Sequence, residues 1–467
     1  MADNEFSISS AAMKLIRDQG FSPYTAMDAH IAEWRAMYTR TDSFYKVPYV
    51  NSAGKKRHRR RASLSPARKV CREMASLILT EDTEVSVEKP NANKWLQAYL
   101  AESNFWPAGY RAVEGAFSLG TSAWALSFDV TDDATRITLP RNDARMVLPL
   151  SWGQTGVTEC AFVTRIVSRG KPAEQVQIMA MDKDTGTYHV RTWLLRNGVA
   201  LDPEAEGIIA DFDTQSRFKP FGIFTPGLEN VHDDLSPMGP ALFADAIDEL
   251  KAVDIAWDAF IQEVANTGVK VFVDDELIDA NGAEGGDPVP VGVAEDMYYR
   301  KVEGKEMKNY IEVFSPTIRT DQLLTALNTA LAELGDQCGF GQNYFTIDKA
   351  GGMKTAKEVV ADNSQLMRNV RKHEVVIRGA IQDVVSALLD NARIHCGADI
   401  EEDFGPVSVH FDDSVITDTQ TEKETMLSEI AAGVVPKWMY LVRFYGKSEQ
   451  EARDIVAAEA PAVPAFF

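Results

Sequence analysis

The chain has 467 residues, 45% of them apolar and 25% charged, which is enough for two or three packed domains. A formal net charge of −21 argues against a static DNA binder, because such a protein needs lysine and arginine to displace counterions from phosphates. Four cysteines without paired spacing argue against a disulfide framework or a cysteine-built metal site. Without a signal-peptide core or an apolar run of about 18 residues, neither a secretory signal nor a membrane span is expected.

The first 125 residues predict mainly helices, around 30–37, 66–79 and 92–101. Between the first two lies the only dense basic run, Lys55–Arg61. Two interpretations are open for it: a solvated loop arm, or a contact to nucleic acid or to an acidic neighbouring subunit. Because the chain is so acidic, we favour the neighbouring subunit over DNA.

Residues 122 to 224 change to short β-type segments with β-branched and aromatic residues. The predicted strands are 123–130, 145–150, 160–167, 175–181 and 188–195. Between the last two, Asp182–Gly186 is similar to the start of a calcium loop, but the liganding acid expected further on is missing. A hairpin turn is therefore the favoured interpretation.

Two amphipathic helices then enclose a β-rich island. Ser236 as N-cap and Pro237 as first helical residue predict a helix that runs to about Asn266 with one apolar face. The island covers 268–316, and a leucine-lined helix follows from Thr320, with Gly335 as a left-handed cap. The two helices must run antiparallel to bring the ends of the island together, which is typical of a projecting stalk with a small tip.

The remaining chain predicts a mobile loop, one long helix and a small helical end. Glycine and lysine residues mark the loop between Gly339 and Thr355, and the long helix follows over 356–394. A strand is expected at 407–411, and three short helices after it.

No motif predicts catalysis. Gly446-Lys447-Ser448 imitates the end of a phosphate loop, but its opening glycine would fall at Leu441 and its flanks indicate helices. Adjacent acids such as Asp412-Asp413 point to opposite faces of a strand, which favours a surface position over a metal site. We therefore expect no catalytic residue, no metal and no cofactor.

Several motifs follow one another in a recognisable order. They are Ala67–Cys71 with Leu77-Ile78, Ser236-Pro237-Met238-Gly239 with Asp254, the island between two helices, Lys354–Val360 with Asn363-Ser364, Phe411–Asp418, and Ala432–Val435 with Arg443–Gly446. In this order they resemble the portal proteins, or head-to-tail connectors, of long-tailed double-stranded-DNA bacteriophages. The resemblance covers nearly the whole chain and is strongest from Ser236 to about Glu459.

The resemblance implies an α+β fold assembled into a ring. Its regions would be a wing of helices and a β-rich body (1–236), a first stem helix (237–266), a clip (267–316), a second stem helix (317–336), a tunnel loop (337–355), a long wing helix with a strand (356–414), and a helical crown with a tail (415–467). The crown is short, which argues against a crown that grips packaged DNA.

The resemblance also implies a setting and partners. Portal proteins form a ring of twelve subunits at one capsid vertex, and double-stranded DNA passes through it. The expected partners are the terminase large subunit, a head-tail adaptor, and the major capsid and scaffolding proteins, with no membrane. The expected location is the virion vertex, and the host cytoplasm during assembly.

Four residues of the predicted tunnel-loop segment and its exit are candidates to face the DNA: Asn343, Lys349, Lys354 and Lys357. An acidic channel wall would repel the duplex from every side, and the three lysines would add weak contacts at a constriction. The competing interpretation is that these lysines are simply exposed to solvent.

Two alternatives to the portal remain. Another ring-forming connector or a minor capsid protein would not need a stalk with a β-rich tip. A DNA-packaging enzyme subunit would need a complete phosphate loop or an acidic metal cluster, and the sequence has neither.

Overall fold

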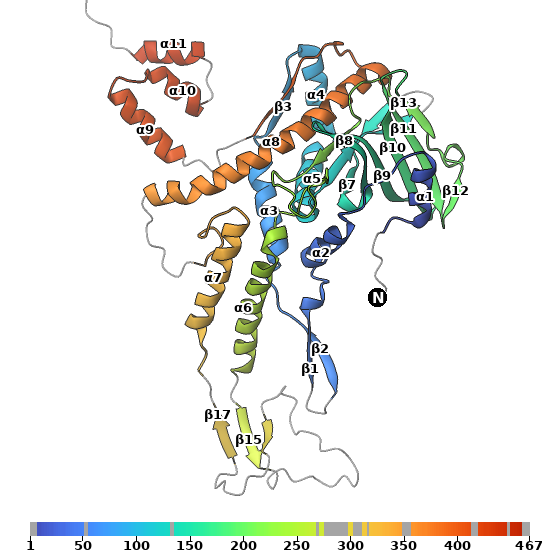
Figure 1. Ribbon diagram of the computed structural model, residues 1–467. Helices are drawn as coiled ribbons and strands as arrows, with labels where there is room; N and C mark the ends of the chain where they lie inside the picture. The colour runs from blue at the N-terminus through green and yellow to red at the C-terminus, as the bar shows by residue number, and fades with distance from the viewer. Residues whose placement is uncertain are drawn as a thin grey trace, which may run out of the picture.

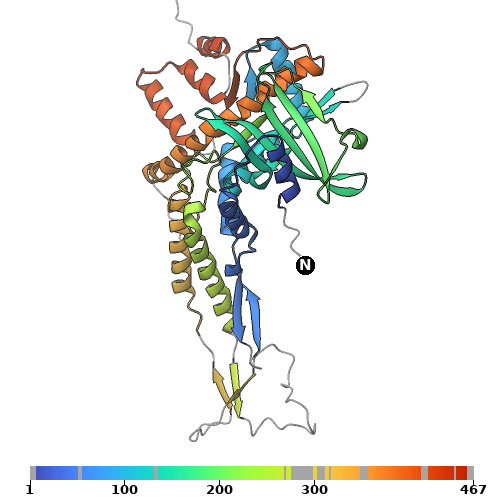
Figure 2. The same cartoon turned by 45° about the vertical axis from the view of Figure 1, so that its right-hand side comes forward.

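The computed structural model describes residues 7–50, 55–130, 135–267, 270–274, 298–301, 311–314, 317–347, 356–411, 419–445 and 449–459. Helices and sheets are mixed along the chain, which confirms the predicted α+β class. Figures 1 and 2 show a broad body of helices and sheet from which an antiparallel helix pair, α6 (Ile247–Asn266) and α7 (Thr320–Gln337), projects.

Helices build the N-terminal part of the body. The predicted helices are present as α2 (Asp28–Thr39), α3 (Pro66–Ile78) and α4 (Pro90–Glu102). The two other helices here are α1 (Ser10–Asp18) and α5 (Phe105–Leu119). Proline stands at the first position of α3 and α4, where its missing N–H is harmless.

A large antiparallel sheet forms the other part of the body. Its strands, in spatial order, are β12 (Val199–Leu201), β11 (Tyr188–Arg196), β10 (Lys171–Met181), β9 (Gly156–Ser168) and β8 (Val147–Gly153), with β13 (Asp211–Asp213) also paired to β11. The predicted strands at 145–150, 160–167, 175–181 and 188–195 are thereby confirmed. The hairpin turn at Asp182–Gly186 is confirmed too, since the Gly186 N–H donates to the Asp182 carbonyl at 2.9 Å.

Both faces of this sheet are covered, and β9 shows how. Cys160 and Phe162 pack toward a small sheet of β14 (Phe221–Phe224), β4 (Ser122–Ala125) and β7 (Arg141–Asp143). Ala161 and Val163 point to the opposite face, where they pack against α1. The period of two along a strand therefore supplies two apolar clusters from one segment.

The strand predicted at 123–130 divides in two. After β4 the chain leaves the small sheet, and β5 (Ser127–Val130) pairs with β6 (Thr135–Thr138) in a separate ribbon. Leu126 marks the break, because it is fully buried and its N–H donates to the Pro220 carbonyl at 2.7 Å.

The first helix of the projecting pair begins ten residues later than predicted, at Ile247 and not at Pro237. Ser236 does cap a turn, since its Oγ accepts the Met238 N–H at 3.1 Å. Pro240, however, disfavours helical geometry at Gly239, and the Leu242 N–H donates to the Phe117 carbonyl at the end of α5. The segment is thus held in the core as a non-helical connection.

The island between α6 and α7 is described only in part. Its strands are β15 (Lys270–Asp274), β16 (Tyr298–Lys301) and β17 (Ile311–Phe314), with β15 in the centre. A hairpin of β1 (Lys46–Val50) and β2 (Lys56–Arg60) runs beside α6 in both views (Figures 1 and 2).

The second helix of the pair ends at Gln337, and the left-handed residue is Gly339, not Gly335 as predicted. The Phe340 N–H donates to the Gly335 carbonyl at 2.8 Å, and the Gly339 N–H to the Asp336 carbonyl at 3.0 Å. This is the Schellman arrangement of a helix end. Gly335 is needed for another reason, because a Cβ there would lie 2.5 Å from the Gly341 carbonyl oxygen.

The predicted long helix is confirmed as α8 (Ala356–His395), and it crosses the body in Figure 1. Its buried side chains, such as Ile381 and Leu388, join the main apolar core with α3 and α5. The predicted strand after it is β18 (Val407–His410), which pairs with β3 (Glu84–Val87).

Three short helices follow, as predicted: α9 (Thr419–Ala431), α10 (Lys437–Tyr445) and α11 (Glu449–Glu459). Figures 1 and 2 place them apart from the sheet, above the start of α8. Short 3-10 turns complete the described elements: η1 (Ser43–Tyr45), η2 (Ala144–Met146), η3 (Glu204–Glu206) and η4 (Ala244–Ala246).

Candidate functional site

Of the four residues selected from the sequence, three belong to the connection between α7 and α8, and Lys357 follows it on α8. Asn343 is exposed shortly after α7 ends, and Lys357 lies in the first turn of α8. Lys349 and Lys354 lie outside the described residues. The structure thus places the two ends of this segment, and the predicted contact of these residues with DNA stays a prediction.

The described first part of this connection is held against α7 and α3. The Asn328 side-chain amide donates to the Ile347 carbonyl at 3.1 Å, and the Ile347 N–H donates back to the Asn328 Oδ1 at 2.9 Å. Tyr344 donates its hydroxyl to Glu73 on α3 at 3.2 Å. Phe340 and Phe345 are buried beneath, with ring centroids 4.9 Å apart. The segment therefore leaves α7 as a fixed turn.

Two acids on α6 fasten the hairpin segment to the helix pair. Asp254 is fully buried, and it accepts hydrogen bonds from the Tyr45 hydroxyl at 3.1 Å, the Ser63 hydroxyl at 2.7 Å and the Leu64 N–H at 2.9 Å. Burial raises the pKa of Asp254, and these neutral donors oppose the shift. Asp254 is thus a structural acid on the inner face of α6.

Asp258, one turn further along α6, binds the basic run. It accepts two hydrogen bonds from the Arg59 guanidinium, at 2.7 and 2.6 Å, and one from the Ala62 N–H at 3.0 Å. Arg61 lies 3.9 Å away and stacks on Phe44 with its guanidinium 4.2 Å from the ring centroid. The Arg59 hydrogen bonds lower the pKa of Asp258. We call this set, Arg59 with Asp258 and Ala62, the hairpin clasp.

The basic run therefore forms a strand and not a loop, and it is largely exposed to solvent, as the first interpretation expected. Its described acidic partner belongs to the same chain, whereas the sequence interpretation favoured a neighbouring subunit. A contact of the outward residues with a neighbour stays a prediction. The spacing of Asp254 and Asp258, four residues apart on the apolar face of a helix, is the signal that could have indicated buried, partnered acids.

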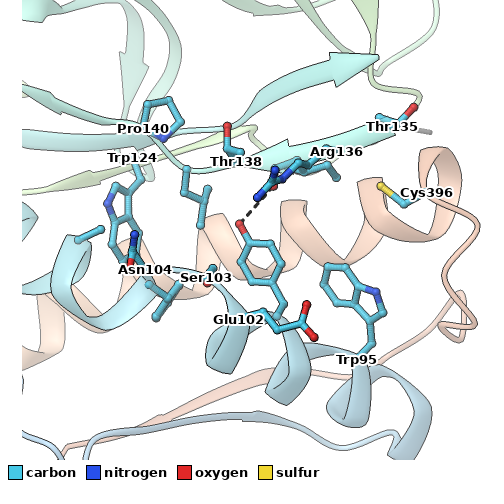
Figure 3. A pocket seen from close by; sticks show the side chains of 15 residues that line it. Trp95, Glu102, Ser103, Asn104, Trp124, Thr135, Arg136, Thr138, Pro140 and Cys396 are labelled. Atoms are coloured by element: carbon cyan, nitrogen blue, oxygen red, sulfur yellow. Dashed lines mark hydrogen bonds between the residues drawn. The ribbon is translucent and has the colours of Figure 1, made fainter. Parts of the chain in front are cut away.

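Apart from these contacts, a cavity of about 600 Å³ lies between α4, α5 and β6 (Figure 3). Trp95 stacks on Tyr99 with centroids 5.4 Å apart, and the Tyr99 hydroxyl donates to the Ile137 carbonyl at 3.4 Å. Burial raises the pKa of Tyr99 to about 12. Arg136 and Cys396 lie at its edge in Figure 3. Among its described lining residues, no nucleophile is hydrogen-bonded to a base.

The described residues hold no group of three or more histidine, cysteine or acidic side chains placed to bind a metal ion. No helix among them is both long and apolar enough to cross a bilayer.

Comparison with known families decides the identity of the fold. The family model described as "Phage portal protein, SPP1 Gp6-like" matches residues 26–462. The chain belongs to this family. As a phage portal protein it forms the ring-shaped channel at the capsid through which the genome is packaged and ejected. The family is structural and not enzymatic, so membership decides against the packaging enzyme considered above.

Other comparisons with this portal protein are distant. A chain from the neck of a native GTA particle, computed with C12 symmetry, is 11% identical with a TM-score of 0.43, and the match covers 93% of this chain and 98% of that one. A chain from the neck of an empty GTA particle, computed with C6 symmetry, is 10% identical with a TM-score of 0.41, covering 96% and 99%. No curated protein sequence matches significantly.

Proposed function

We propose that twelve copies of the chain form the portal ring, with α6 and α7 as its stem. In this arrangement the body would be the wing, 267–316 the clip, 337–355 the tunnel loop and 415–467 the crown. The first stem helix would be shorter than the sequence predicted, because α6 begins at Ile247.

The exposed face of α6 supports this proposal. Ala252, Ile255 and Ala259 form an exposed row on the helix, at spacings of three and four residues. Ile255 is 49% exposed in the single chain. An exposed apolar row on a projecting helix gains stability only when another surface covers it. In a closed ring each copy supplies that surface to the next.

The assembly test compares two exposed apolar positions. Twelve chains of 51.6 kDa would have a mass of about 620 kDa in light scattering. We expect Ile255→Glu to abolish this species, because it places a charge in the stem contact. Val199→Glu, at an exposed position of β12, serves as the matched control and is expected to keep the ring. A wild-type protein that stays monomeric at all concentrations would contradict the proposal.

The tunnel loop would carry the residues that touch DNA. We propose that Asn343, Lys349, Lys354 and Lys357 line the narrowest part of the bore, in a wall that is otherwise acidic. The position of the segment between α7 and α8, with its first part held as a turn, supports this. A small number of phosphate contacts releases few counterions in total, so DNA would be held weakly and could slide.

A charge-reversal experiment tests the tunnel loop. Replacing Lys349, Lys354 and Lys357 by glutamate is expected to shorten the packaged genome in assembled particles. Lys183→Glu, on the exposed turn before β11, is the matched control. An unchanged genome length in the triple variant, with particles formed normally, would remove the assignment.

We also propose partner proteins for the assembled ring. Terminase would dock on the ring during packaging, and the head-tail adaptor would replace it when packaging ends. The major capsid and scaffolding proteins would contact the ring as it is built in the host cytoplasm. Co-purification of the ring with each separately expressed partner tests these contacts one at a time.

A further inference from the structure

A small pocket in the body is lined by more arginine than acid. It has a volume of about 230 Å³ and lies where α2, α5 and β7 meet. Arg35, Arg111 and Arg141 line it, together with Glu114 and Asp143. The whole chain has 69 acidic and 48 basic side chains, so an excess of arginine at one place runs against the overall composition.

Both acids of the pocket are already engaged by arginines that do not line it. The Asp143 carboxylate accepts hydrogen bonds from Nε and Nη2 of Arg145, at 3.1 and 2.7 Å. Glu114 accepts the hydroxyl of Tyr38 and, at 3.2 Å, the Nε of Arg72. Each carboxylate of the pocket is thus already hydrogen-bonded to an arginine outside it.

Two of those wall arginines have no ionic partner in the described part of the chain. No described acid lies within ion-pair distance of Arg111 or Arg141. Both residues line the same 230 Å³ space.

The backbone around Arg141 is built to place its guanidinium. Its Nη1 donates to the Arg111 carbonyl at 3.0 Å, and β7 is fixed by its pairing with β4. A Cβ on Gly115 would lie 2.9 Å from this Nη1, so the glycine leaves the space that the guanidinium occupies. Because Arg111 and Gly115 are one turn apart on α5, the second arginine stands on the same face of the helix.

We propose that this pocket binds a phosphoryl oxyanion between Arg111 and Arg141. Guanidinium groups bind phosphate oxygens through paired, charge-assisted hydrogen bonds. The volume corresponds to roughly eight water molecules, which suits one hydrated phosphate group and is below the usual size of a pocket for an organic ligand. The phosphoryl group belongs either to free phosphate or to the backbone of a nucleic acid. The proposal does not depend on the arrangement of the ring.

Thermal unfolding of the purified full-length protein tests the pocket. Inorganic phosphate is titrated against sodium chloride at matched ionic strength, and the rise of the unfolding temperature is followed to saturation. Arg111→Gln and Arg141→Gln are expected to raise the half-saturating phosphate concentration at least about tenfold, the effect of losing one charge-assisted hydrogen bond. Arg217→Gln, an exposed arginine outside the pocket, is the matched control and should respond as the wild type does.

A second arm identifies the source of the phosphoryl group. If a short DNA duplex competes with phosphate in the wild type and not in Arg111→Gln, the pocket takes a phosphodiester; if it does not compete, the pocket takes the free anion. Equal effects of phosphate and chloride on the wild type would overturn the proposal. So would variants that lower the mass of the assembly while leaving the phosphate response unchanged, because the arginines would then bind a carboxylate of a second copy.

Discussion

Asp254 and Asp258 stand one turn apart on α6, and their pKa values move in opposite directions. Burial raises the pKa of Asp254, whose hydrogen-bond donors are uncharged. The Arg59 guanidinium lowers the pKa of Asp258, because it stabilises the charged carboxylate. The same residue type on the same helix therefore serves as a buried acceptor in one place and as an ion-pair partner in the next.

The hairpin clasp predicts a stability loss from one substitution. Arg59→Gln leaves the Asp258 carboxylate, which is only 4% exposed, without its bidentate partner. We expect the free energy of unfolding to fall by about 2 kcal/mol, measured by urea denaturation. Arg57→Gln, at an exposed position of the same strand, is the control and should change it by less than about 0.5 kcal/mol.

The same clasp has a pH signature. The lowered pKa means that the stability from Asp258 is complete above its unfolded pKa of about 3.9 and is lost as the pH falls through the lower folded value. The difference in free energy of unfolding between Arg59→Gln and the wild type should therefore become smaller below about pH 4. If this difference in stability stays constant down to the lowest pH at which the protein folds, the ion pair between Arg59 and Asp258 is not its cause.

His373 on α8 predicts a pH dependence of a different kind. It is buried, its Nδ1 accepts the Gly227 N–H at 2.9 Å, and burial lowers its pKa to about 4. Between about pH 6.5 and 4 the unfolded chain binds a proton here that the folded chain does not, so stability falls with falling pH, by about 3 kcal/mol over the full window.

Urea denaturation across this pH window measures the effect. In His373→Gln, which keeps an acceptor for the Gly227 N–H, the loss of stability on acidification should be smaller than in the wild type. His58→Gln, at an exposed strand position, should follow the wild-type curve. Parallel curves for all three proteins would contradict a neutral, buried His373.

At the scale of elements, glycines mark where segments approach closely. Gly120 ends α5 with φ +80°, and a Cβ there would lie 2.1 Å from the Gly239 carbonyl oxygen. Gly170 has a similar φ of +74° in the turn between β9 and β10, but it has open space around it. A side chain at Gly170 would therefore meet backbone strain alone, whereas one at Gly120 would meet backbone strain and a steric clash.

Alanine at each glycine should give very different results. Gly170→Ala is expected to cost about 1–2 kcal/mol, the cost of a left-handed backbone for a residue with a Cβ. Gly120→Ala carries that cost and also pushes apart α5 and the connection before α6, so we expect a loss above about 4 kcal/mol and little soluble protein. Soluble yield and the urea midpoint are measured for both variants. Similar midpoints would refute the close contact between Gly120 and the Gly239 carbonyl.

Individual helices and strands differ in how well their bounds could be predicted from the sequence. Local patterns located α3, α8 and most strands of the large sheet, because the period of apolar residues reflects burial directly. The predicted start of α6 was wrong. Ser236-Pro237 does cap a turn, but contacts of the following residues with α5 prevent a helix from continuing there. The clasp of Arg59 on Asp258 joins residues 199 positions apart, and no local pattern specifies such a pair.

At the scale of the whole molecule, charge and assembly oppose each other. Each chain carries a formal charge of −21, and the proposed ring of twelve would concentrate that charge around one axis. Repulsion between exposed charges reaches about 30 Å at 0.01 M salt and about 8 Å at physiological ionic strength. The apolar contacts proposed for α6 have little dependence on salt.

The balance predicts that salt favours the ring. At low ionic strength the wild type should dissociate toward smaller species, and raising the salt should restore the ring, since screening removes repulsion and leaves apolar burial. Mass measured at fixed protein concentration across a salt series follows this directly. Ile255→Glu should stay dissociated at every salt concentration, because its defect is the lost apolar contact. A wild-type ring that instead weakens with added salt would mean that ion pairs between copies hold it, and that the excess of acid is balanced at the interface by arginines and lysines of the neighbouring copy.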